Sequence, residues 1–275
     1  MYLVSIIIPC YNMGTLLLET IDSVQKVIDP AKHEVLIVND GSTDGETLKV
    51  LDGLRSRYTI IDQHNQGLSA ARNTGILAAT GKYLLFLDAD NLLTDAYLTQ
   101  GVAVMETHAE IDIVYGPSMA FGGEKEFLLP VRPFNLQMLM IDNYIDACCL
   151  VRKTAFDGIG LFDTNMKVGM EDWEMWLRMA FNQRKFYFLE GTVVQKYRVR
   201  SNSMIHTIGK NRRDSTMEYI AKKYPEQLDF DAMSDFTYRK FKAAPLGWTA
   251  KFFIKRFSEP LFNYLVSKGK IRKHF

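Results

Sequence analysis

Two aspartates separated by one residue directly follow an apolar stretch of the chain. Asp88 and Asp90 flank Ala89, after the run Tyr-Leu-Leu-Phe-Leu of residues 83–87. Two carboxylates at a strand end can bind one hard divalent cation, because Mg²⁺ or Mn²⁺ takes few protein carboxylates beside phosphate oxygens and water. An Asp-x-Asp triplet alone more often forms a solvated turn with an N-cap, but the strand before this one favours the cation site.

Two further side chains can contact a nucleotide, and each also has a structural explanation. Asp40 lies in the turn-forming sequence Asn-Asp-Gly-Ser of residues 39–42. It either closes an Asx-type turn or accepts hydrogen bonds from a base or ribose. Arg72 lies on an alanine-rich stretch that follows a loop, where it is either a surface cation or a contact for a pyrophosphate.

Glu171 and Asp172 open an amphipathic stretch, residues 171–181, whose apolar positions predict a helix. Acidic side chains in the first helical turn are favoured by the helix dipole, which is the structural explanation for this pair. The functional explanation is that one of the two carboxylates acts as a general base.

The first 120 residues alternate strand and helix patterns. Residues 4–9 form a continuous apolar run, as expected of a strand buried on both faces. Further strands are predicted at 34–38, 58–62, 82–87 and 111–115, and helices at 17–28, 43–57, 68–79 and 94–107. This alternation predicts a Rossmann-like α/β fold with a mostly parallel sheet, in which ligands bind beyond the carboxyl ends of the strands.

The alternation stops after residue 120. Residues 122–125 predict a hairpin turn or loop, 147–151 a strand, and the chain from 209 onward a charged helical region. The helix at 171–181 is expected to carry its large apolar side chains on one face, namely Trp173, Trp176, Leu177, Ala180 and Phe181.

Composition limits the classes of protein that fit. The 275 residues are 47% hydrophobic with a net charge of +1, which suits one large domain or one domain with a helical appendage and gives no electrostatic argument for nucleic acid. The three cysteines are odd in number and two are adjacent, so a reducing, cytoplasmic compartment is expected. The apolar start lacks a basic segment and a cleavage site, and no apolar stretch approaches the length of a membrane span.

Five ordered motifs carry a family resemblance: VSIIIPCYN, VLIVNDGSTDGET, NQGLSAARNTG, GKYLLFLDAD and EDWEMWLR. Together they resemble family 2 glycosyltransferases with the GT-A fold, over residues 3–205. The resemblance implies transfer of a sugar from a nucleotide sugar, usually a UDP-sugar, to an acceptor hydroxyl with inversion. It also implies a role in cell-surface polysaccharide or glycoconjugate synthesis, with a glycan or lipid-linked acceptor.

The same resemblance assigns domains and site residues. Residues 1–208 would be the catalytic domain, with a nucleotide-binding half at 1–115 and an acceptor-binding half at 116–208, followed by a helical extension at 209–275. It implies a nucleotide site formed by Pro9, Tyr11, Asn12, Asp40, Arg72 and Asp88, a Mn²⁺ or Mg²⁺ site at Asp90 with Asp88, and a catalytic base at Asp172 with Glu171 orienting sugar or acceptor. Tyr144, Asp146 and Lys167 are candidate contacts for sugar or acceptor.

One position departs from the family pattern. Related enzymes often carry Tyr-Arg-x-His after the acid pair, whereas residues 197–200 read Tyr-Arg-Val-Arg. Arg200 is therefore expected to neutralise the leaving diphosphate, and His206 is a nearby candidate metal ligand. The requirement for a metal is open on this pattern.

Three alternatives stay open. A nucleotidyltransferase would show a glycine-rich, basic phosphate loop after the first strand, but residues 9–14 contain no Lys or Arg. A non-catalytic nucleotide-sugar or glycan-binding protein would bind UDP without transfer. The aromatic and basic residues of 248–275 either lie on a membrane surface or pack on the catalytic domain or a second subunit of a homodimer.

Overall fold

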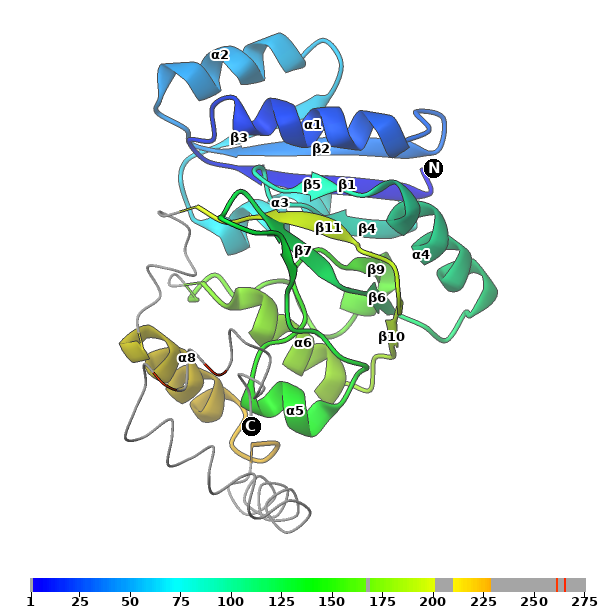
Figure 1. The fold of residues 1–275 in the computed structure, drawn as a ribbon, viewed down its shortest axis with the longest axis vertical. Helices are drawn as coiled ribbons and strands as arrows, with labels where there is room; N and C mark the ends of the chain where they lie inside the picture. The colour runs from blue at the N-terminus through cyan, green and yellow to red at the C-terminus, as the bar shows by residue number, and fades with distance from the viewer. Residues whose placement is uncertain (1, 167–168, 201–209, 229–260, 262–264, 266–275) are drawn as a thin grey trace. The chain divides into compact units, whose positions relative to one another are not determined.

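The computed structural model describes residues 2–166, 169–200, 210–228, 261 and 265 (Figure 1). Residues 1–220 form one compact unit and 221–275 a second. The first unit contains, in chain order, β1 (Val4–Cys10), α1 (Leu16–Val27), β2 (His33–Asp40), α2 (Gly45–Leu54), β3 (Thr59–Gln63), α3 (Leu68–Ala78), β4 (Tyr83–Phe86), β5 (Leu92–Leu93), α4 (Asp95–Thr107), β6 (Ile113–Tyr115), β7 (Ser118–Phe121), β8 (Phe127–Leu128), α5 (Leu136–Ile141), β9 (Leu150–Arg152), a 3-10 turn (Lys153–Phe156), α6 (Glu171–Phe181), β10 (Phe186–Phe188) and β11 (Gln195–Arg198).

The central sheet has seven strands in the order β10-β6-β9-β4-β1-β2-β3. Strands β1, β2, β3 and β4 pair in parallel, which confirms the predicted Rossmann-like half, and β6 pairs in parallel with β10. Strand β9 runs antiparallel between β4 and β6. Its apolar run at 147–151 indicated a strand, but neither its direction nor its insertion follows from an apolar run alone.

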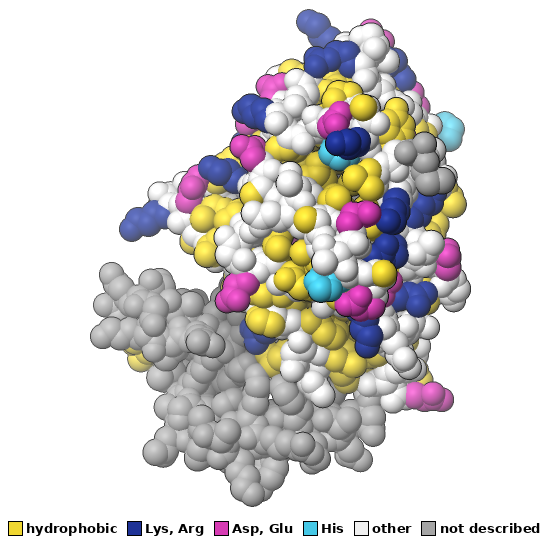
Figure 2. All heavy atoms as spheres, turned by 90° about the vertical axis from the view of Figure 1, so that its right-hand side faces the viewer, with side chains coloured by type: hydrophobic (Ala, Val, Ile, Leu, Met, Phe, Trp, Pro, Cys, Tyr) yellow, Lys and Arg dark blue, Asp and Glu magenta, His cyan; other side chains and the backbone are white. Residues whose placement is uncertain are grey.

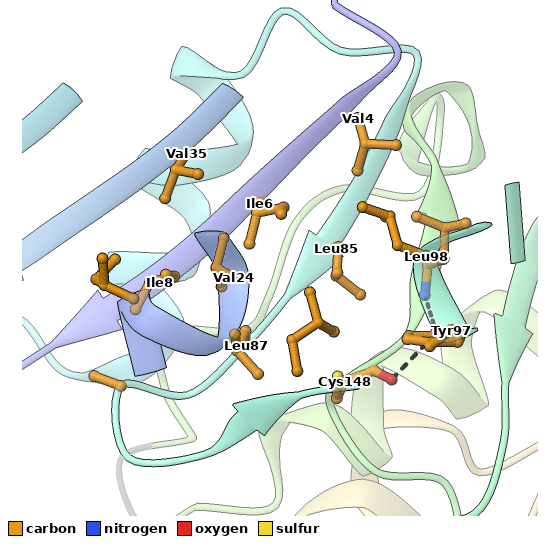
Figure 3. Packing of buried hydrophobic residues seen from close by; sticks show 14 of the residues in the cluster. Val4, Ile6, Ile8, Val24, Val35, Leu85, Leu87, Tyr97, Leu98 and Cys148 are labelled. Atoms are coloured by element: carbon orange, nitrogen blue, oxygen red, sulfur yellow. Dashed lines mark hydrogen bonds between the residues drawn. The ribbon is translucent and has the colours of Figure 1, made fainter. Parts of the chain in front are cut away.

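Strand β1 is buried on both faces, as its continuous apolar run predicts. Val4, Ile6 and Ile8 alternate onto the face that packs against Val24 of α1 (Figure 3). Ile7 points to the opposite face, where it meets α3 at Gly75. Because a Cβ at that position would overlap Ile7, the glycine lets the helix approach the sheet closely.

A second sheet of four strands, in the order β5-β11-β7-β8, lies beside the first. Strands β7 and β8 pair antiparallel, so the predicted turn at 122–125 is confirmed, with Gly122 at φ +84°. Strand β11 pairs with β7 in parallel and with β5, the strand that follows the aspartate pair, antiparallel. This pairing brings residues 195–200 to the carboxyl end of β4.

Helix α6 begins at Glu171 and ends at Phe181, the limits that the sequence predicts. The predicted apolar face is buried to different degrees along the helix. Trp173, Trp176 and Leu177 are buried as predicted, but Ala180 and Phe181 are only half-buried. Met175, Met179 and Glu174 are buried as well, so protein surrounds more than one face of the helix.

The predicted helical region after 209 begins with α8 (Lys210–Lys223). Within the described parts of the chain, no helix is both long enough and apolar enough to span a bilayer. Most of 248–275 lies outside the described residues, so its two interpretations stay predictions, as do the domain limits at 115 and 208. Figure 2 shows a face on which basic and acidic side chains are interspersed, as the net charge of +1 suggests.

Candidate active site

The aspartate pair forms a turn at the end of β4. The backbone N–H of Leu87 donates to Ile7 of β1, and the N–H of Asn91 donates to the carbonyl of Asp88. Ala89 is buried, the Asp88 side chain is 35% exposed and the Asp90 side chain 13% exposed. A turn is therefore present, but its carboxylates are held largely by the protein and not by solvent.

Arg72 of α3 is fully buried and joins three parts of the site. Its Nη2 donates to Asp88 Oδ1 at 2.8 Å, and its Nη1 donates to Glu171 Oε1 at the start of α6. Its guanidinium also lies over the ring of Phe162, 5.4 Å from the centroid. Burial alone would lower the pKa of Arg72, but the charges of Asp88 and Glu171 outweigh it and raise the pKa. The surface-cation explanation is therefore wrong.

The acid pair lies at the first turn of α6, after Met170 in the left-handed conformation (φ 65°). Asp172 Oδ2 accepts from Asn143 Nδ2 at 3.1 Å, and Oδ1 accepts from the N–H of Trp173 at 2.8 Å. Burial and the neighbouring charge of Glu171 raise the pKa of Asp172, against the opposing charge of Arg72. A carboxylate with a raised pKa accepts a proton more readily than an ordinary aspartate does, as a general base requires.

Strand β11 brings two arginines to the aspartate pair. Arg200 Nη2 lies 2.7 Å from Asp90 Oδ2. Arg198 Nε donates to the carbonyl of Asp90 at 2.8 Å, and Arg198 Nη2 donates to Glu19 of α1 at 2.7 Å. Burial and the charge of Asp88 raise the pKa of Asp90, while the two arginines oppose that shift.

A further carboxylate, that of Asp146, lies at the same edge of the sheet as the aspartate pair. Leu150 of β9 pairs with Leu85 of the antiparallel β4, so the residues just before β9 lie beside the carboxyl end of β4. Asp146 Oδ1 accepts from Gln195 Nε2 at 2.6 Å and from the N–H of Cys148 at 2.8 Å. Burial, followed by the charge of Asp88, raises its pKa to about 6.

The predicted residues after β1 and β2 are bound to neighbouring loops. Asn39, and not Asp40, closes the turn at 39–42, because its Oδ1 accepts from the N–H of Ser42. Asp40 accepts from Gln63 Nε2 and from the N–H groups of residues 66 and 67, at 2.7 to 2.9 Å. Asn12 accepts from the N–H of Thr43 at 2.8 Å. These contacts hold together the loops that follow three parallel strands.

The predicted nucleotide residues therefore fall into two groups. Pro9 is buried within β1, and Tyr11 is 43% exposed beside Asn12. Arg72, Asp88 and Arg200 belong to the charged cluster at the end of β4, together with Glu171, which Arg72 binds.

The other predicted contacts belong to neither of these two groups or lie outside the described residues. The Tyr144 hydroxyl exchanges hydrogen bonds with the backbone of Asn135. His206 and Lys167 lie outside the described residues.

The carboxylates of the aspartate turn can be compared with the ligands that a divalent metal needs. Among the described residues, no group of three or more His, Cys, Asp or Glu side chains is arranged to hold a metal. Asp88 and Asp90 supply two carboxylates at one turn, which suits a hard cation that takes its other ligands from phosphate and water. Each carboxylate is bound by an arginine in this structure, Arg72 and Arg200 respectively.

Sequence reasoning missed three polar residues of the site. Asn143 binds Asp172, Gln195 binds Asp146, and Arg198 binds the backbone of the aspartate turn. Gln195 is fully buried, yet its position between apolar and basic residues gives no periodic signal. Asn143 lies just before the apolar run at 147–151, next to the candidate contacts Tyr144 and Asp146. All three cysteines are buried and free.

Comparison with known proteins identifies the family. The model of glycosyl transferase family 2 matches residues 5–209. The minor teichoic acid biosynthesis protein GgaB of Bacillus subtilis is 30% identical over 210 residues, which cover 72% of this chain and 23% of GgaB. The Escherichia coli UDP-Glc:alpha-D-GlcNAc-diphosphoundecaprenol beta-1,3-glucosyltransferase WfgD is 34% identical over 116 residues, which cover 42% of this chain and 45% of WfgD. The chain thus spans less than half the length of either relative.

Solved structures show the same fold. S. aureus TarS 1-349 in complex with UDP-GlcNAc superposes with a TM-score of 0.64 at 18% identity, covering 82% of this chain and 67% of that chain. The complex with UDP gives a TM-score of 0.61, covering 82% of this chain and 71% of that chain. These neighbours are GT-A-type enzymes, and the largely parallel central sheet confirms the predicted GT-A class. With a family match over most of its length, the chain belongs to glycosyl transferase family 2.

Proposed function

We propose that this enzyme transfers a hexose from a UDP-sugar to an acceptor hydroxyl with inversion at the anomeric carbon. One observation carries the proposal: a single buried arginine, Arg72, holds Asp88 of the aspartate turn and Glu171 of the acid pair in one cluster. The groups suited to a diphosphate and the group suited to a base thus lie in one site. The TarS complexes with UDP and UDP-GlcNAc, and the UDP-Glc in the name of WfgD, support the donor class.

In the proposed sugar transfer, opposite charges develop at two places in this site. Positive charge develops on the sugar ring and negative charge on the leaving diphosphate as the bond breaks. Asp90 and Asp88 would hold Mn²⁺ or Mg²⁺, which supplies positive charge to the diphosphate when bound. Arg200 supplies a fixed positive charge at the same turn. Asp172 takes the proton of the attacking hydroxyl, and Asn143 holds Asp172 in position. Glu171 orients the sugar or the acceptor.

The remaining nucleotide contacts are assigned to the ends of β1 and β2. Pro9, Tyr11 and Asn12 line the nucleotide, and Asp40 holds the base through the loop that it orders at residues 66 and 67. The acceptor is a glycan or a lipid-linked sugar of a cell-surface polysaccharide, as the names of GgaB and WfgD suggest. The free cysteines fit a cytoplasmic enzyme at the inner face of a membrane.

Thermal unfolding with nucleotides tests the donor class. The panel is UDP, GDP, CDP and their common sugar conjugates, each with Mn²⁺, with Mg²⁺ and with EDTA. A ligand at a hundred times its Kd stabilises the fold by about 2.7 kcal/mol, which gives a readable shift in Tm. A UDP-specific shift followed by UDP release in turnover supports the proposal. A shift without turnover supports the non-catalytic alternative, and no shift with any UDP compound contradicts the donor class.

Arg200 gives a prediction about the metal requirement. Because its guanidinium contacts Asp90, Arg200→Ala is expected to weaken UDP binding in EDTA by about tenfold, the value of one charge-assisted hydrogen bond. Arg200→His is expected to bind UDP weakly in EDTA and to recover with Mn²⁺, since a neutral imidazole is a metal ligand. Isothermal titration calorimetry measures both, with exposed Asp52→Asn on α2 as the control. Equal Kd values in EDTA for the wild type and Arg200→Ala would contradict this role.

A further inference from the structure

Asp146 has one carboxylate oxygen bound by the protein and one that is not. Oδ1 accepts from Gln195 Nε2 and from the N–H of Cys148. No hydrogen bond from the described residues reaches Oδ2, and Asp146 is not fully buried. A carboxylate oxygen held at a ligand site without a protein donor is suited to accept a hydrogen bond from a ligand hydroxyl or amide.

The position of Asp146 within the site indicates which part of the ligand it contacts. Asn143, three residues before Asp146, binds Asp172 of the acid pair. Gln195, which binds Asp146, lies on β11 with Arg198, which binds the backbone of the aspartate turn. Asp146 therefore lies near both the diphosphate side and the base side of the proposed reaction. The reacting carbon must lie between those two sides, because the acceptor attacks from the side opposite to the leaving group. A hydrogen-bond acceptor placed between them faces the ring of the transferred sugar.

We propose that Asp146 Oδ2 accepts a hydrogen bond from a ring hydroxyl of the donor hexose, and so helps to select the sugar that is transferred. This inference rests on the proposed function, since it needs a nucleotide sugar in this site. Gln195 and the N–H of Cys148 are positioning groups, because they fix the carboxylate through Oδ1. Strand β11 and the residues just after it thus contribute to each side of the donor, with Gln195 at the sugar and Arg200 at the diphosphate.

The substitution Asp146→Asn tests the inference selectively. An asparagine amide oxygen in the place of Oδ1 still accepts from Gln195 Nε2 and the N–H of Cys148, whereas Oδ2 becomes an NH₂ donor. The fold is therefore expected to keep its Tm, which thermal unfolding checks, while the acceptor for the sugar hydroxyl is lost. Asp52→Asn, on the exposed face of α2, is the matched control for the same chemical change.

Calorimetry with UDP, UDP-glucose, UDP-galactose and UDP-N-acetylglucosamine gives the readout. For the UDP-sugar that the wild type binds most tightly, Asp146→Asn is expected to raise Kd about 10- to 100-fold, as for loss of a hydrogen bond to a charged group. The Kd for UDP is expected to stay within about twofold. An unchanged Kd for the UDP-sugar, or an equal rise for UDP and the UDP-sugar, would overturn the inference. If the wild type binds neither, the UDP-donor proposal itself fails and the inference fails with it.

Donors that lack one ring hydroxyl identify the contact and also test the wild type. One deoxy UDP-sugar is expected to bind the wild type about 10-fold or more weakly than its parent, but to bind Asp146→Asn no more weakly than its parent. This coupling does not depend on the absolute stability of the variant. Equal losses for every deoxy donor in both proteins would overturn the assignment of Asp146 to a hydroxyl.

Discussion

Replacing Asp172 by asparagine is expected to lower kcat by about 10²- to 10⁴-fold while the Kd for UDP changes little. The amide keeps the shape of the side chain but cannot take the proton of the attacking hydroxyl. The substitution leaves in place the contacts of Arg72 with Asp88 of the aspartate turn and with Glu171. Steady-state release of UDP from the best donor, with the acceptor that supports turnover, measures kcat. A variant that retains most of the wild-type kcat would exclude Asp172 as the base.

The same residue predicts the acid limb of the pH profile. Asp172 must be ionised to act as a base, so kcat rises as pH rises through its pKa, which burial and Glu171 raise. Glu171→Gln removes the neighbouring negative charge and leaves Arg72 beside Asp172, which lowers that pKa. The acid limb of kcat is therefore expected to move to lower pH in Glu171→Gln. Profiles measured from pH 5 to 9 that superpose after scaling would show that Asp172 does not control this limb.

The local parts of the fold were predictable because local patterns determine them. The strand at 4–9 follows from an apolar run with both faces buried, and the helix at 171–181 from the spacing of its tryptophans. The local sequence of each element determines its conformation more than its contacts with the rest of the chain do. The antiparallel insertion of β9 between β4 and β6 depends on pairing across long sequence separations, which no window of residues contains.

The site shows the same division. The motifs indicated which residues carry charge at the strand ends, but not which of them bind one another. Arg72 and Glu171 are 99 residues apart, and the contact between Arg198 and Asn91 joins residues 107 apart. The contact with Glu171 makes Arg72 a buried side chain that holds the acidic groups together. The sequence suggested that Arg72 is a pyrophosphate contact or a surface cation. The metal and nucleotide assignments stay predictions that the binding experiments above address.

Replacing the buried Arg72 is expected to have a large effect on stability. Arg72→Met is expected to lower the free energy of unfolding by about 3–5 kcal/mol, because breaking a buried ion pair leaves a charge without a partner. Glu171, which is buried, bears this cost, whereas the Asp88 side chain is 35% exposed and can be hydrated. Urea denaturation followed by circular dichroism measures the change. A loss below about 1 kcal/mol would mean that Arg72 does not hold this cluster together.

Two further variants separate charge from geometry. Arg72→Lys keeps the positive charge but cannot bind Asp88 and Glu171 with two parallel N–H groups, so it is expected to recover only part of the stability. The double variant Arg72→Met with Glu171→Gln removes the orphaned charge, and it is expected to be more stable than Arg72→Met alone. A double variant that is less stable than either single one would show that the two residues act independently. In that case the buried contact between α3 and α6 would not connect the diphosphate side of the site to its base.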